Sequence, residues 1–202
     1  DVTITARNAM VNAAESRANQ KSGGTGVGAS VAINIGETDT DALLGEGATI
    51  AGADGIKLDA NSGNRLTTEA TGGAKGKTAV TPVIAVAVSN DETIASVLKH
   101  DGGTLNLGGD LEVNAAHAGS SVTKATGDTE SGDTGVGISL ALTIATDSAL
   151  ATTERNINAG GAVKFASRVT SPNEARAKAS VAGGDSNKDA ESNKAKDGKD
   201  HG

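Results

Sequence analysis

The sequence predicts an all-β fold, a parallel β-solenoid built from repeats of about 54 residues. Three observations predict it. Short motifs recur at a near-constant spacing along the chain, and apolar residues alternate with small or polar ones. The segments between these runs are rich in Gly, Asn and Asp, which is typical of turns between strands.

Two markers define the repeat. The string at residues 25–28 returns at 134–137, with a degenerate copy at 78–81. A short strand at residues 2–6 has counterparts in the later repeats, at residues 56–60, 111–115 and 163–167. One such unit cannot bury its apolar side chains alone, so a stack of equivalent units is the expected architecture.

The most informative segment is a long alternating strand in each repeat, in which bulky aliphatic residues alternate with small ones. Successive side chains of a strand point to opposite faces. We expect the bulky positions to form internal columns from coil to coil, with Val31, Ile84 and Leu140 in one column. The small-residue face is either a weakly polar outer surface or a face that a second layer approaches closely.

Each repeat contains five short extended segments, so we expect two coils of about 27 residues per repeat and a stack about 35 Å tall. The last segment of the first repeat is expected at residues 48–51. Residues 8–19 have a composition that also suits a helix, but their alignment with residues 65–70 favours a strand. Pro82 cannot donate a ladder hydrogen bond, so the middle copy is expected to be locally irregular.

We divide the chain into a repeat segment, residues 1–182, and a polar stretch, residues 183–202, which we expect to be a flexible loop or tail. The chain starts at Asp1 with neither an initiating Met nor a recognisable secretion signal. We therefore expect it to be a piece of a longer protein.

The composition excludes several classes of site. The 202 residues contain no Cys, Trp or Tyr, which excludes a disulfide framework and an aromatic platform for bases or sugars. The net charge of -7 argues against a phosphate-binding surface. No apolar run reaches the roughly 18 residues that a membrane-spanning helix needs. We therefore expect neither a nucleic-acid partner nor membrane insertion.

The polar stretch contains the one metal-like motif. Asp185, Asn187 and Asp189 have the spacing of the first three ligands of a Ca²⁺ loop. The glycine that should follow is replaced by Ala190, and the twelfth position holds Lys196 instead of Glu. A solvated loop is the favoured interpretation and a Ca²⁺ site the alternative, so no metal and no cofactor is assigned.

Other motifs do not assign chemistry either. The glycine-rich run at residues 24–28 lacks the Lys-Ser/Thr ending of a phosphate loop and precedes a strand, which favours turn glycines. His100, His117 and His201 occupy non-equivalent places in the repeats and lack the spacing of a helical metal pair.

A carbohydrate-cleaving site would break the symmetry of the repeats, because one coil would carry residues that the others lack. The nearest candidates are Glu154 and Arg155, which have no equivalents in the other copies. A solvated turn is the favoured interpretation of this pair. We therefore assign no catalytic residue and expect that the chain is not an enzyme.

The strings at residues 25–34, 134–143 and 109–115 resemble the repeats of very large bacterial exoproteins, the filamentous-haemagglutinin-like and leukotoxin-like filamentous adhesins. The resemblance covers residues 1–182. It implies a right-handed parallel β-helix that is secreted and displayed at the cell surface, in adhesion, biofilm or fibre formation. Such stalks carry no catalytic residues, so the resemblance implies no site.

The expected function is that of a structural stalk or filament segment of a secreted or cell-surface bacterial adhesin or extracellular fibre. The expected partners are further copies, by self-association into fibres or head-to-tail stacking, and a host or matrix surface. The alternative is a solenoid module that binds carbohydrate or protein. A third hypothesis is a β-helix enzyme that degrades polysaccharide.

Overall fold

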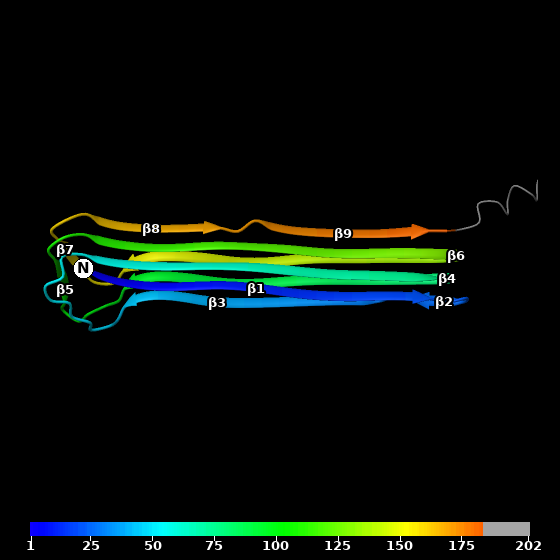
Figure 1. Cartoon of the computed structure of the whole chain (residues 1–202), viewed down its shortest axis with the longest axis horizontal. Coiled ribbons are helices and arrows are strands. Elements are labelled where there is room, and N and C mark those ends of the chain that lie inside the picture. The colour runs from blue at the N-terminus through cyan, green and yellow to red at the C-terminus, as the bar shows by residue number, and fades with distance from the viewer. Residues whose placement is uncertain (184–202) are drawn as a thin grey trace, which may run out of the picture.

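In the computed structural model, residues 1–183 are described, and all of their regular elements are strands (Figure 1). The all-β prediction is therefore confirmed for this part of the chain. No helix in it is long and apolar enough to cross a membrane. The strands are β1 (Val2–Lys21), β2 (Thr25–Val27), β3 (Ser30–Leu44), β4 (Ile56–Val97), β5 (Thr104–Leu107), β6 (Leu111–Thr153), β7 (Asn156–Ala159), β8 (Val163–Thr170) and β9 (Asn173–Ala182).

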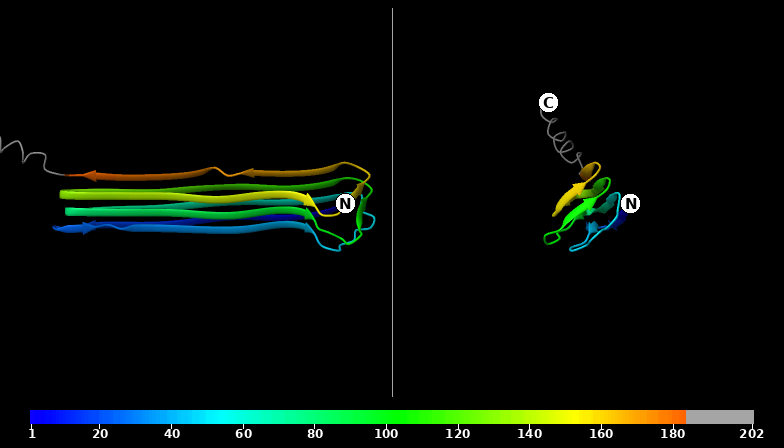
Figure 2. Two further views of the ribbon diagram at one scale, coloured as in Figure 1. Left: turned by 180° about the vertical axis from the view of Figure 1, so that it is seen from behind. Right: turned by 90° about the vertical axis from the view of Figure 1, so that its left-hand side faces the viewer.

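The two longest strands, β4 and β6, double back on themselves. Their mutual register shifts just after Gly76, and Ser62 and Thr93, both in β4, face each other with their hydroxyl oxygens 2.5 Å apart. In the first repeat β1 is the outgoing strand, and β2 and β3 together form the return strand. The two face each other, because the Ser30 hydroxyl of β3 donates to the backbone carbonyl of Ser16 in β1 at 2.9 Å. Each of the first three repeats thus supplies an outgoing and a return strand along the long axis of the molecule, and β8 and β9 add a fourth outgoing strand (Figures 1 and 2).

Successive repeats pair in parallel and in register. Val2 pairs with Ile56, Ile56 with Leu111, and Leu111 with Val163. Neighbouring strands are thus one whole repeat apart in sequence, and the prediction of two coils per repeat is wrong. The expected short segments are continuous, because glycines between them such as Gly63 stay in the ladder and form no turn. The four outgoing strands span only about 14 Å at the usual strand spacing, and not 35 Å.

The predicted columns exist, but they face outward. Val31 pairs with Ile84 and Ile84 with Leu140, and these side chains are 54%, 37% and 52% exposed. The small-residue face of the same strands is buried, with Val83 and Ala85 at 0% exposure. The prediction of an aliphatic interior formed by these columns is therefore wrong. The layer that approaches the small-residue face is formed by the outgoing strands of the repeats themselves, and not by covering loops or a neighbouring solenoid.

Glycines explain why the small-residue face lies inside. A Cβ atom on Gly28 would lie 1.9 Å from the carbonyl oxygen of Gly73, and one on Gly72 would lie 2.6 Å from a methyl group of Val83. The outgoing and return layers are therefore closer here than the roughly 10 Å that separates ordinary stacked sheets. The bulky aliphatic side chains of the return strands do not fit into so narrow a space.

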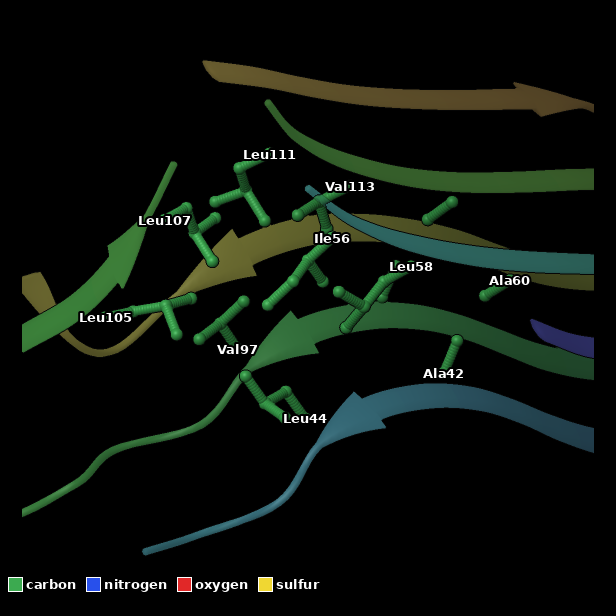
Figure 3. Close-up of a cluster of buried hydrophobic side chains, with 12 residues drawn as sticks. Ala42, Leu44, Ile56, Leu58, Ala60, Val97, Leu105, Leu107, Leu111 and Val113 are labelled. Carbon is green, nitrogen blue, oxygen red and sulfur yellow. The ribbon is translucent and has the colours of Figure 1, made fainter. Parts of the chain in front are cut away.

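The interior is divided into three zones along the strands. At the end of the long strands where the loops with β5 and β7 lie, aliphatic side chains of β3, β4, β5 and β6 form the larger hydrophobic cluster (Figure 3). Towards the other end a smaller cluster consists of Ala32, Ala70, Val83, Ala85 and Ala125. Between the two clusters most of the buried side chains are polar, with the apolar Leu66 and Ala87 among them. This polar zone holds the candidate site.

Two segments of the first repeat, residues 8–19 and 48–51, differ in structure. Residues 8–19 lie in β1, which pairs in parallel with β4 over its whole length, so the strand interpretation is confirmed. Residues 48–51 are not a strand, although Ile50 packs against the larger hydrophobic cluster. The left-handed glycines Gly47 and Gly52 bracket this segment with φ angles of 66° and 73° and turn the chain out of the ladder.

Pro82 interrupts the ladder on one side. It stays in register with β6, whereas the opposite neighbour is broken between β2 and β3. The Gly28 amide donates to the Val80 carbonyl at 3.0 Å, and the next bond of a parallel ladder would need an N–H on Pro82, which proline lacks. The irregularity therefore lies in the first repeat, in the strand next to the proline, and not in the middle copy where it was expected.

Candidate functional site

A buried cluster of ionisable side chains lies in the polar zone. Its members are Asp91, His117 and Asp147, and one potential ligand atom from each lies within 4.8 Å of the others. Asp91 is 1% exposed, and the side chains of His117 and Asp147 are 0% and 5% exposed. The register creates the cluster: Asp91 pairs with Asp147 on the neighbouring return strand, and His117 faces them from the outgoing half of β6.

Neutral donors hold the two carboxylates in place. Asp91 accepts hydrogen bonds from the Thr38 hydroxyl and the Asn64 side-chain amide. One oxygen of Asp147 accepts a hydrogen bond from the Ser171 hydroxyl. These donors come from β3, from the outgoing half of β4 and from the segment between β8 and β9, so every described repeat contributes to the cluster.

The imidazole of His117 is held on one side only. Its Nδ1 atom lies 2.7 Å from the Ser62 hydroxyl oxygen, which in turn lies 2.5 Å from that of Thr93. Its Nε2 atom lies 3.4 Å from the Oδ1 atom of Asp147. Within residues 1–183 these last two atoms are buried and have no hydrogen-bond partner.

Burial raises the pKa of Asp91 above its ordinary value, because desolvation disfavours the charged carboxylate. The neighbouring carboxyl group of Asp147 raises this pKa further, whereas the hydrogen bond from Thr38 and the charge of His117 lower it. Two buried carboxylates on adjacent strands repel each other unless a proton or a cation lies between them. The cluster is therefore suited to holding positive charge.

The repeats themselves carry a signal for this cluster. Asp91 and Asp147 occupy equivalent places after the strings at 78–81 and 134–137, and Thr38 precedes them in the same column. Because sequence analysis assigns the bulky face to the interior, it places this column on the outside. Reversal of the faces brings both aspartates inside.

Arg155, a candidate from the sequence, has a structural position. Its guanidinium donates to the backbone carbonyls of Leu98 at 2.6 Å, Ala48 at 2.9 Å and Gly45 at 3.1 Å. The solvated-turn interpretation is therefore wrong for Arg155, which ties together the loops of three repeats. Its neighbour Glu154 is exposed, as that interpretation predicts.

The remaining candidates are not brought together. His100 lies in the loop after β4, apart from His117 in β6. The glycines of residues 24–28 lead into β2 and β3, in agreement with the interpretation as glycines that enter a strand. The Ca²⁺ candidates and one further histidine lie outside the described residues: Asp185, Asn187, Asp189 and His201.

The two outer surfaces differ in chemistry. The outgoing strands present charged columns, such as Glu112 between Lys57 and Lys164 at 3.1 and 2.9 Å. The return strands present exposed aliphatic side chains, which we call the aliphatic face. Its members are Val27, Val31, Ile33, Ile35, Ile84, Val136, Ile138, Leu140, Leu142, Ile144 and Leu150.

No protein family, no curated protein and no solved structure matches the chain. The function is therefore inferred from the arrangement of the repeats and from the two outer surfaces.

Proposed function

We propose that the chain is a structural segment, a parallel β-solenoid that forms part of a stalk or fibre. One observation carries this proposal: equivalent residues of successive repeats pair in register, each one repeat from the next. Each further repeat of this kind would add one strand to each layer and continue every column. A stack of this kind extends by repetition and needs no chemistry of its own.

The proposed segment is a flat tape. A strand of 20 residues such as β1 is about 65 Å long at about 3.3 Å per residue. The tape would therefore be about 65 Å wide and two layers thick, and it would lengthen by about 4.8 Å per repeat. Backbone hydrogen bonds across the whole width would make it rigid.

The aliphatic face supports lateral association with a second copy. Apolar patches of several hundred Å² on a protein surface are usually sites of contact. Columns with the strand spacing on one copy match the same columns on another, so the face is complementary to itself. Its three strands cover about 400 Å², so two copies would bury about 800 Å², less than the roughly 1,200 Å² of a stable complex. Pairing would therefore strengthen as repeats are added.

The proposed location is extracellular, at the bacterial cell surface. It is supported by the resemblance of residues 25–34 and 134–143 to filamentous adhesin repeats. Binding of carbohydrate or protein by the same solenoid is the alternative function. Selective binding of one glycan on an array would favour it, because a spacer binds none.

Small-angle X-ray scattering tests the structural proposal. The chain is compared with a variant in which residues 56–162, two repeats, are duplicated. We expect the width of about 65 Å and the thickness of two layers to stay constant. The length along the stacking direction should grow by about 10 Å. Growth in all dimensions, as expected for an added independent globule, would overturn the proposal.

A further inference from the structure

Two buried atoms of the polar cluster face each other without a hydrogen bond. They are Nε2 of His117 and Oδ1 of Asp147, 3.4 Å apart, and neither has a partner within the described residues. Buried polar atoms in proteins nearly always have one. A direct hydrogen bond would draw a nitrogen and an oxygen to about 2.9 Å. Two ligands of one tetrahedral zinc ion, each about 2.0–2.2 Å from the metal, lie about 3.3 Å apart.

We propose that Asp91, His117 and Asp147 bind a divalent transition-metal ion, with Zn²⁺ as the best-fitting ion. One imidazole nitrogen and two carboxylates form a ligand set that zinc accepts. Ca²⁺ and Mg²⁺ prefer oxygen ligands alone, so the nitrogen argues against them. The two positive charges of the ion balance two carboxylates that would otherwise repel each other in the interior.

The groups around the cluster suit this role. When Nδ1 of His117 carries the proton, it donates to the hydroxyl of Ser62 and leaves the lone pair of Nε2 directed at the metal. The carboxylates of Asp91 and Asp147 are oriented by the donors described above, among them Thr38 and Ser171. Each proposed ligand therefore has an outer partner, as metal ligands in proteins usually do.

The columns of the repeats show that these ligands break the symmetry. The column of Asp91 and Asp147 begins with Thr38. The column of His117 contains Ser62 before it and Val169 after it. A stack that needed only hydrogen bonding here could use Ser or Thr throughout. The bound ion would join the two layers and link the second repeat to the third.

Zinc titration of the tag-free full chain, after removal of metal with a chelator, tests the proposal. We expect one Zn²⁺ per chain by calorimetry, and a rise in Tm of about 5 °C when free Zn²⁺ is 100 times its Kd. Co²⁺ should give the visible absorption of a low-coordinate site. His117→Gln should abolish binding, and His100→Gln, which changes a histidine outside the cluster, should leave it intact.

Asp147→Asn separates the metal site from a purely structural cluster. This substitution removes a ligand charge and also relieves the repulsion from Asp91. We therefore expect a metal-free Tm at or above that of the unsubstituted chain, together with loss of the Zn²⁺-dependent rise. Circular dichroism confirms that each variant is folded. Absence of saturable Zn²⁺ or Co²⁺ binding by the unsubstituted chain would overturn the proposal. The proposal would also be overturned if Asp147→Asn lowered the Tm of the metal-free chain, or if folded His117→Gln bound Zn²⁺ as tightly as the unsubstituted chain.

Discussion

In-register pairing places each side chain beside its equivalents in the neighbouring repeats, so a single charge interacts with both. Glu112 lies between two lysines on the polar outer surface, at 3.1 Å from Lys57 and 2.9 Å from Lys164. A hydrogen bond from Asn114 and, after it, those from the two lysines lower the pKa of Glu112 to about 2. The column of Asp91 and Asp147 is the opposite case, because like charges are stacked there in the interior.

We predict that Glu112 titrates near pH 2, well below its ordinary value of 4.5. Because the folded-state pKa is lowered, the carboxylate stabilises the fold at pH values above 4.5. This contribution is lost as the pH falls from 4.5 to about 2. Carboxyl-carbon NMR gives the midpoint, and Glu112→Gln should weaken the pH dependence of Tm in this window. The control Glu46→Gln, in the loop after β3, should leave that pH dependence unchanged. A titration midpoint of Glu112 near 4.5 would show that Asn114 and the two lysines do not stabilise its carboxylate.

For each strand, the sequence determines the alternation and the partner but not the face that is buried. The repeat spacing predicted which positions share a column, because equivalent positions of a stack must align, and Val31, Ile84 and Leu140 do form one column. It did not predict that these strands are direct neighbours, because two coils per repeat would place another strand between them. Which side of this column is buried depends on the outgoing strand that faces it. Gly72 and its neighbours leave room there only for small side chains.

The candidate site was missed for the same reason. Asp91 and Asp147 are adjacent by repeat alignment alone, but their burial follows from the choice of face. His117 joins them only because β6 doubles back, a contact across 30 residues that no local pattern contains. The outward-facing glutamate and lysine columns, in contrast, follow directly from repeat alignment and alternation.

Neighbouring residues on the return half of β4 test the assignment of faces. Val83 is 0% and Ile84 is 37% exposed. Val83→Lys would place an ammonium group between two closely spaced layers, and we expect a loss of several kcal/mol or failure to fold. Ile84→Lys points to solvent, and we expect a change of about 1 kcal/mol or less. Urea unfolding measures both, and the reverse order of stability would show that the bulky face is the interior.

The whole molecule has two unlike surfaces, and this asymmetry has mechanical consequences. A tape two layers thick bends far more easily across its thin direction than within the plane of its sheets. Pairing through the aliphatic face would double the thickness, and the polar surfaces with their charged columns would remain in contact with water. A net charge of -7 on the segment would oppose further, unspecific stacking.

Lateral pairing should therefore depend on the number of repeats and on apolar contact. Each added repeat contributes about 300 Å² of buried surface to a pair, so we expect the association constant, measured by analytical ultracentrifugation, to rise at least tenfold per repeat. Leu140→Lys should weaken pairing, whereas Thr67→Lys adds the same charge on the polar surface and should leave it unchanged. Sulfate should strengthen apolar pairing. Association that is independent of repeat number and weakened equally by both variants would instead reflect charge, and the aliphatic face would then have no part in it.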